Sequence, residues 1–199
     1  MSDVFAPTNS RAPFDPRPLI VPLTVPLLVF GPALAFYGCR AVWVQHVISE
    51  LGLPFERAYE AYAWSTLAGG LGLVAGGIVA VLIGGWGTAA LGAAFLAVSL
   101  FLMPSLTVDA GLVGLGGPLW MTSFARMMGT VGLLVVLCDA FRGRRTWLLI
   151  GAGGLSGIGL NLAALFAGSL PNLQLPGATV FVGMALVAGV SAVLALLAG

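Results

Sequence analysis

Few side chains in this sequence could do acid–base, nucleophilic or metal chemistry. The 199 residues include one histidine (His46), two cysteines, seven acidic residues and eight cations, all of them arginine. Ser156, in the segment Gly-Leu-Ser-Gly, could act as a nucleophile only beside a general base, and no histidine follows it. Neither a zinc-ligand spacing nor a phosphate-binding loop with a lysine is present. The sequence therefore predicts no enzyme and no cofactor, and a net charge of +1 predicts no nucleic-acid partner.

Arg126 is the charged residue whose position most needs an explanation. It lies near the middle of a predicted helix over 111–138, and a guanidinium at the bilayer centre costs at least ~2.5–3.5 kcal/mol on insertion scales. Asp139 follows it at about 20 Å along a helix, too far for a salt bridge. The expected acceptors are Asn161, carbonyls freed by the prolines of the first helix, or an acidic group on a partner chain or lipid. A functional arginine and a structural one are both open alternatives.

The elements that hold these residues are predicted to be membrane helices. Hydrophobic residues make up 59% of the chain and charged residues 8%, whereas a soluble domain carries about 25% charged residues. Six stretches approach the length of about 20 mainly apolar residues that a bilayer-crossing helix needs: 19–46, 60–83, 87–104, 111–138, 147–169 and 177–198. The predicted fold is all-α, a polytopic membrane protein with six transmembrane helices over 19–199 and an irregular cytoplasmic tail over 1–18.

Arginine placement orients these helices, because short loops rich in arginine stay on the cytoplasmic side. Five of the eight arginines lie on one side of a six-helix bundle: Arg11, Arg17, Arg142, Arg144 and Arg145. Arg57 lies on the other side, so both termini are predicted to be cytoplasmic, in a bacterial inner membrane. Asp139 is predicted to pair with an arginine of the connection that follows it, as a structural latch. His46 is predicted to be an interfacial side chain rather than a metal ligand.

Small residues recur at helical spacing and predict close helix packing. Gly72 and Gly76 lie four residues apart in the second predicted helix, and Gly153 and Gly157 do the same in the fifth. Such residues let helix backbones approach closely where lipid gives no hydrophobic drive for association. All four glycines are therefore predicted helix-packing positions.

The segment "FYGCRAVWVQHVISELGLPFERAYEAYAW" carries a family resemblance. It resembles the end of helix one and the start of helix two in proton-dependent oligopeptide transporters, which belong to the major facilitator superfamily. The segment "CDAFRGRRTWLLIGAGGLSGIGLNLAALFAG" resembles that superfamily's junction of helices four and five. The resemblance implies the N-terminal six-helix half of a twelve-helix transporter. It adds Arg40, Asp139 and Asn161 to Arg126 as candidate functional or interface residues.

Several residues that carry chemistry in that family have no counterpart here. Positions 29–33 are Val-Phe-Gly-Pro-Ala in place of a Glu-x-x-Glu-Arg motif tied to proton coupling, and the family's helix-four lysine falls at or near Thr130. The sequence therefore predicts a non-catalytic integral membrane subunit, a degenerate transporter half that acts as a scaffold or accessory chain in a larger complex. The alternative is a half-size transporter that forms a solute pathway as a homodimer or with a second six-helix chain. The predicted partners are membrane lipids and other membrane chains or a copy of itself.

Overall fold

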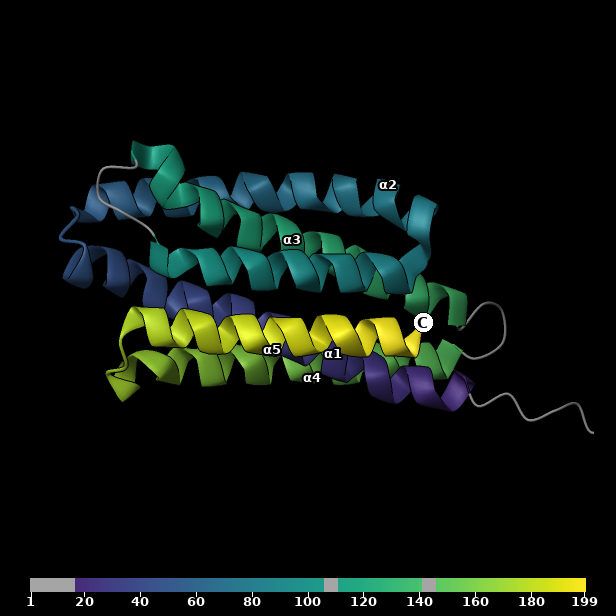
Figure 1. The fold of residues 1–199 in the computed structure, drawn as a ribbon. Coiled ribbons are helices and arrows are strands. Elements are labelled where there is room, and N and C mark those ends of the chain that lie inside the picture. The colour runs from purple at the N-terminus through teal and green to yellow at the C-terminus, as the bar shows by residue number, and fades with distance from the viewer. Residues whose placement is uncertain (1–16, 106–110, 141–145) are drawn as a thin grey trace, which may run out of the picture.

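The described part of the protein is a bundle of long helices (Figure 1). The computed structural model describes residues 17–105, 111–140 and 146–199. The elements are α1 Arg17–Gln45, the π-helix η1 His46–Glu50, α2 Phe55–Leu102, the 3-10 helix η2 Met103–Ser105, α3 Gly111–Ala140, α4 Thr146–Ser169, the 3-10 helix η4 Leu170–Leu173 and α5 Gly177–Ala198. These residues contain no strand, which confirms the predicted all-α class. Arg11 and the arginines of the connection at 141–145 lie outside the described residues.

Helix α2 reverses direction at Gly84. This glycine has φ +76° and ψ 173°, values outside the helical region, at a backbone conformation that L side chains rarely adopt. It divides α2 into two arms, 55–83 and 85–102, and in Figure 1 the second arm runs back along the bundle. The sequence predicted separate helices at 60–83 and 87–104 with a four-residue turn between them. The structure needs no such loop, because one glycine supplies the reversal.

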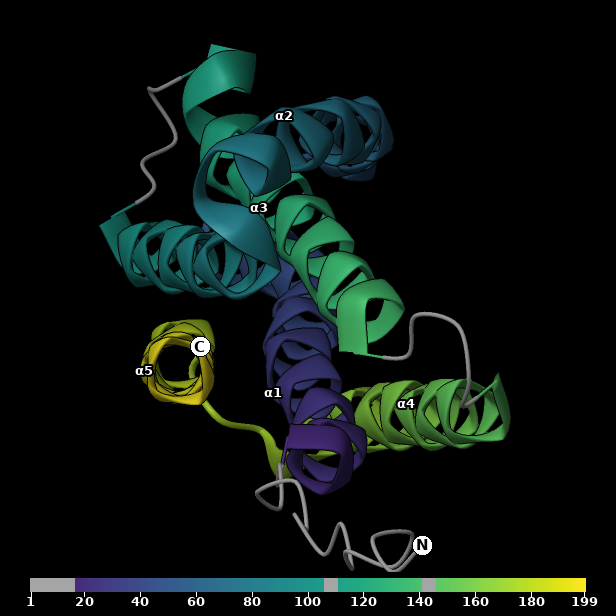
Figure 2. The ribbon, with the colours of Figure 1, turned by 90° about the vertical axis from the view of Figure 1, so that its right-hand side faces the viewer.

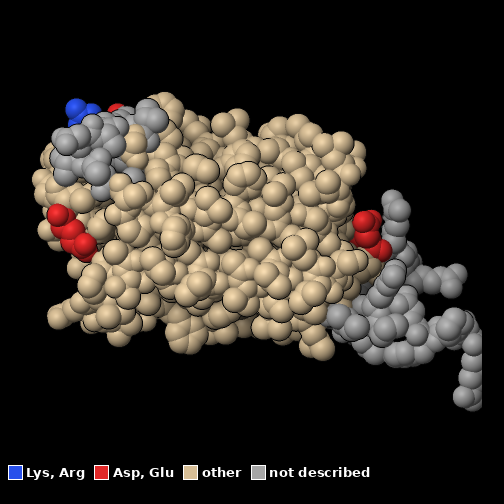
Figure 3. Space-filling model, in the orientation of Figure 1, with Lys and Arg blue, Asp and Glu red and all other residues tan. Residues whose placement is uncertain are grey.

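Five helices of the described chain are long and apolar enough to cross a membrane, with α2 counted once. They indicate an integral membrane protein. The face of the molecule in Figure 3 carries charged side chains only near its two ends, with a broad uncharged band between them. That distribution suits a bilayer, since the hydrocarbon core is about 30 Å thick and excludes unpaired charge.

Helix α3 packs closely against both arms of α2 (Figure 2). A Cβ at Gly72 would collide with the backbone of Phe124, and one at Gly76 would lie 3.0 Å from the Cα of Met128. On the second arm, a Cβ at Gly92 would lie 2.5 Å from the Cα of Gly129. Only glycine allows these approaches, so van der Waals contact between backbones stabilises this part of the bundle.

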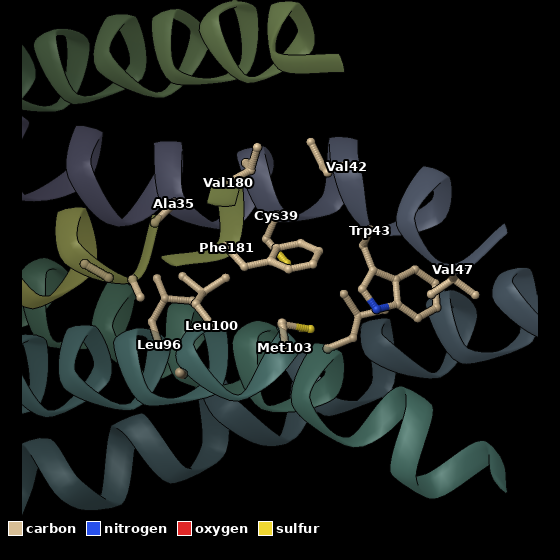
Figure 4. Packing of buried hydrophobic residues seen from close by; sticks show 14 of the residues in the cluster. Ala35, Cys39, Val42, Trp43, Val47, Leu96, Leu100, Met103, Val180 and Phe181 are labelled. Atoms are coloured by element: carbon tan, nitrogen blue, oxygen red, sulfur yellow. The ribbon is translucent and has the colours of Figure 1, made fainter. Parts of the chain in front are cut away.

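The buried core lies where α1, the second arm of α2 and α5 meet (Figure 4). Trp43 of α1, Leu100 of α2 and Phe181 of α5 are fully buried in it. Because lipid is as apolar as these side chains, their mutual packing rather than their removal from water holds the helices together.

The π-helix η1, which follows directly on α1, is hydrogen-bonded to the start of α5. The backbone N–H of Gly177 donates to Glu50 Oε1 at 3.0 Å, and His46 Nδ1 lies 2.9 Å from Glu50 Oε2. His46 is buried, with 6% of its surface exposed, and its ring meets Phe181 edge to face at 5.2 Å. The sequence predicted an interfacial His46. Its depth in the membrane stays a prediction. Its burial within the protein is possible because Gly177 leaves room: a Cβ at 177 would lie 2.6 Å from its Nδ1.

Candidate functional site

Two arginines from different helices contact one aromatic ring. The Cζ atoms of Arg40 and Arg126 lie 4.7 and 4.6 Å from the ring centroid of Phe36. Arg40 also lies 4.3 Å from the ring of Tyr62, and Arg126 lies 4.9 Å from the ring of Tyr37. Three rings and two guanidinium groups therefore alternate, and these five side chains are named the arginine–aromatic stack below.

Helix periodicity explains part of this arrangement. Phe36 and Arg40 lie four residues apart on α1, so they share one face of that helix. Tyr37 is adjacent to Phe36, and the two rings meet edge to face at 5.4 Å. Arg126 comes from α3 and Tyr62 from the first arm of α2, so the packing of three helices completes the stack.

Each guanidinium donates a hydrogen bond to a side chain. Arg126 Nη2 donates to the Tyr37 hydroxyl at 3.2 Å, and Arg40 Nη2 donates to the Ser65 hydroxyl. Ser65 in turn donates to the backbone carbonyl of Tyr62 at 2.5 Å. Arg40 Nε is buried without a hydrogen-bond partner among the described residues.

No carboxylate of the described residues lies within salt-bridge distance of either guanidinium. The ion pairs in this part of the chain are His46 with Glu50 and Arg57 with Glu60, both outside the stack. A guanidinium has five N–H donors, and the described side chains supply one acceptor to each of Arg40 and Arg126. The stack therefore keeps two positive charges with unused donors and without an internal counter-ion.

Comparison with protein-family models, with curated proteins and with solved structures finds no match. The resemblance to oligopeptide transporters thus stays a prediction that rests on the residues of the sequence. What the site can bind is therefore inferred from its geometry alone.

The cost of burying the two arginines of the stack and the gain from their cation–π contacts are similar in size. Placing two arginines in the hydrocarbon core would cost up to about 5–7 kcal/mol in total on insertion scales, whose values apply to the centre of a helix. Cation–π contacts contribute about 0.5–2 kcal/mol each, depending on how fully they are desolvated, and the stack has four of them. The rings thus offset much of the cost without any carboxylate. The two cations can persist in the bundle and still attract an anion.

The other candidate residues lie outside the stack. Asn161 is exposed on α4, where its Nδ2 donates to the carbonyl of Gly157 at 2.9 Å. Asp139 is exposed near the end of α3, and the arginines predicted to pair with it lie outside the described residues. The sequence predicted proline-freed carbonyls or Asn161 as acceptors for Arg126. The structure supplies the Tyr37 hydroxyl and two rings, because α1 presents its aromatic face to α3 and continues as a helix through its prolines.

The four predicted packing glycines differ in their surroundings. Gly72 and Gly76 lie against α3, as described above. No atom of the described residues lies within 4 Å of a Cβ built at Gly153 or Gly157. The side of α4 that carries these two glycines is therefore open in the described chain.

Sequence reasoning missed the aromatic members of the stack. The spacing of Phe36 and Arg40 was a usable signal, since residues four apart on a helix are neighbours. Tyr62 gave no comparable signal, because its contact with Arg40 depends on how α2 packs on α1.

Proposed function

We propose that this chain is a non-catalytic integral membrane subunit, a scaffold or accessory chain that associates laterally with other membrane chains. In this proposal it is a degenerate half of a major-facilitator-type transporter in a bacterial inner membrane. The open face of α4 carries the proposal: no described residue lies within 4 Å of a Cβ built at Gly153 or Gly157, and Asn161 is exposed beside them. An amide and small residues on a membrane-facing surface favour contact with another helix, since both are typical of helix–helix interfaces in lipid.

Six membrane crossings form part of the proposal. The arms of α2 on either side of Gly84 span about 44 and 27 Å at 1.5 Å per residue. Each is then long enough to cross a hydrocarbon core of about 30 Å, the shorter one with slight thinning. Six crossings place both termini on one side, and arginine placement makes that side cytoplasmic.

The topology can be tested by labelling single cysteines in a variant that lacks Cys39 and Cys138. A cysteine at Pro54 should react only from outside the cell. A cysteine at Gly143, in a connection outside the described residues, should react only from the cytoplasm. Labelling of both from the same side would refute six crossings.

Lateral association can be tested by the native mass of the protein after mild detergent extraction. We expect a complex that contains chains other than this one. Replacing Gly153 and Gly157 with leucine should release those chains, because leucine blocks close approach of a neighbouring helix. The matched control replaces Gly183 and Gly189 of α5, which also have no neighbour within 4 Å of a built Cβ. Equal loss of the complex in both variants would contradict a specific role for the α4 face.

A half-size transporter is the second candidate, and the arginine–aromatic stack favours it. Two cations without a described counter-ion suit a pathway for an anionic solute, formed by a homodimer or with a second six-helix chain. A native mass that corresponds to two copies of this chain alone would support this candidate over the accessory subunit. A complex of unrelated chains would favour the accessory subunit.

A further inference from the structure

A cavity of about 130 Å³ lies beside Arg126, inside the bundle. Residues of α1, the second arm of α2, α3, α4 and α5 line it. Its apolar wall includes Leu28 of α1, Ala93 and Leu96 of α2 and Leu133 of α3. The cavity is therefore formed by this one chain, between its helices, and it is partly open rather than fully enclosed.

The polar part of the cavity wall is small and has a defined hydrogen-bonding character. Thr130 and Ser191 line the cavity, but their hydroxyls donate to the carbonyls of Arg126 and Val187, both at 2.9 Å. The hydroxyl hydrogens of Thr130 and Ser191 are therefore already used in hydrogen bonds. Arg126 also lines the cavity and donates one hydrogen bond among the described residues, to Tyr37. The free donors and the only formal charge of the described wall thus belong to Arg126.

The size and chemistry of the wall select one class of ligand. An apolar protein cavity of about 150 Å³ holds a molecule the size of benzene. The cavity beside Arg126 is somewhat smaller but partly open, so it limits the apolar body of a ligand to about one small ring. A cation with unused N–H groups pairs best with a carboxylate, through charge-assisted hydrogen bonds. We propose that this cavity binds the anion of a small monocarboxylic acid, with the carboxylate at Arg126 and a compact apolar body among α1, α2 and α3.

This site does not depend on either proposed function, because a single chain forms it. A scaffold could keep such a ligand as a fixed structural component, and a transporter could move it. Loss of the partner complex would therefore leave the site intact, and failure of ligand binding would leave the partner proposal intact.

Calorimetric titration of the purified full chain in neutral detergent tests the site, with benzoate as the probe. Benzyl alcohol keeps the apolar ring and lacks the charge, while acetate keeps the carboxylate and lacks the ring. We expect benzoate to bind at least tenfold more tightly than either. Equal affinity for benzyl alcohol or for acetate would overturn the proposal, and this comparison on the unaltered chain needs no variant.

Three variants locate the binding. Arg126→Gln should weaken benzoate binding at least tenfold, and Ala33→Leu should weaken it similarly by filling the cavity from α1. Arg57→Gln removes an exposed arginine paired with Glu60 and should leave the affinity unchanged. Benzoate binding that survives both of the first two changes would place the ligand elsewhere and overturn the proposal. The anion in this cavity could be a free carboxylate or the headgroup of an anionic lipid, and repeating the titration with added phosphatidic acid separates these two. Complete displacement of benzoate by the lipid would assign the cavity to a lipid headgroup instead.

Discussion

Phe36 should couple energetically to Arg126, because both arginines contact its ring. The ring is 3% exposed, so its two cation–π contacts are largely desolvated. Such contacts are worth about 1–2 kcal/mol each near the upper end of the measured range. Replacing Phe36 with leucine should therefore lower the free energy of unfolding by about 2–4 kcal/mol through the lost contacts.

Replacing Arg126 with leucine should change stability much less. The change removes a burial cost of about 2.5–3.5 kcal/mol, together with two cation–π contacts worth about 2–4 kcal/mol and one hydrogen bond to Tyr37. These terms nearly cancel, so the isolated bundle should remain folded. The two single substitutions should thus change the free energy of unfolding by different amounts, although both remove a member of the same stack.

A double-mutant cycle on Phe36→Leu and Arg126→Leu isolates the contact. The unfolding free energies, measured by dodecyl sulfate titration of the protein in mixed micelles, should give a coupling of about 1–2 kcal/mol. Phe181→Leu is the matched control, because Phe181 is also fully buried but meets His46 rather than an arginine. Phe181→Leu and Arg126→Leu should be additive within about 0.5 kcal/mol. A coupling below that limit for Phe36 and Arg126 would refute the stack as an energetic unit.

Three further predictions follow from other parts of the bundle. Gly72→Ala should destabilise the protein by about 1–3 kcal/mol in the same titration, because its Cβ would collide with the backbone of α3. Gly77→Ala, where a Cβ meets open space on the same arm, should not. Glu50→Gln should cost about 0.3–2 kcal/mol by removing a charge at the N-terminus of α5. The protein alone in vesicles should show no proton-driven peptide uptake, because positions 29–33 carry no ionisable side chain, and robust uptake would contradict this.

Helix positions were largely predictable from the sequence, since the apolar runs are long and bounded by breaks. The predicted segments 147–169 and 177–198 end at the same residues as α4 and α5 and begin within one residue of them. The break of α2 was expected in the right place, although as a four-residue turn rather than a single reversal at Gly84. Helix positions and breaks are local features, so they can be predicted from composition and hydrophobic periodicity.

Most of the stack was not predictable, because every cation–π contact in it except that of Arg40 with Phe36 crosses between helices. The sequence identified Arg40 and Arg126 as separate candidates, one by family resemblance and the other by the cost of its burial. Nothing in the linear pattern shows that both guanidiniums meet the ring of Phe36. In the same way, the pattern of small residues could not distinguish Gly72, which touches α3, from Gly153, whose surroundings in the described chain are open.

The nature of the groups around the stack limits how its charge can change. Arginine stays protonated in proteins, and the described residues place no carboxylate within salt-bridge distance of Arg40 or Arg126. A proton-coupled carrier needs a group that gains and loses a proton as its ligand binds and leaves. Since the two guanidiniums keep their charge throughout the physiological pH range, they can hold an anion but cannot themselves couple that anion to a proton. If the chain takes part in transport, any proton coupling must therefore come from groups other than these two arginines. Benzoate affinity should accordingly stay constant across the physiological pH range, and a steep change in that range would reveal a titrating group at the site.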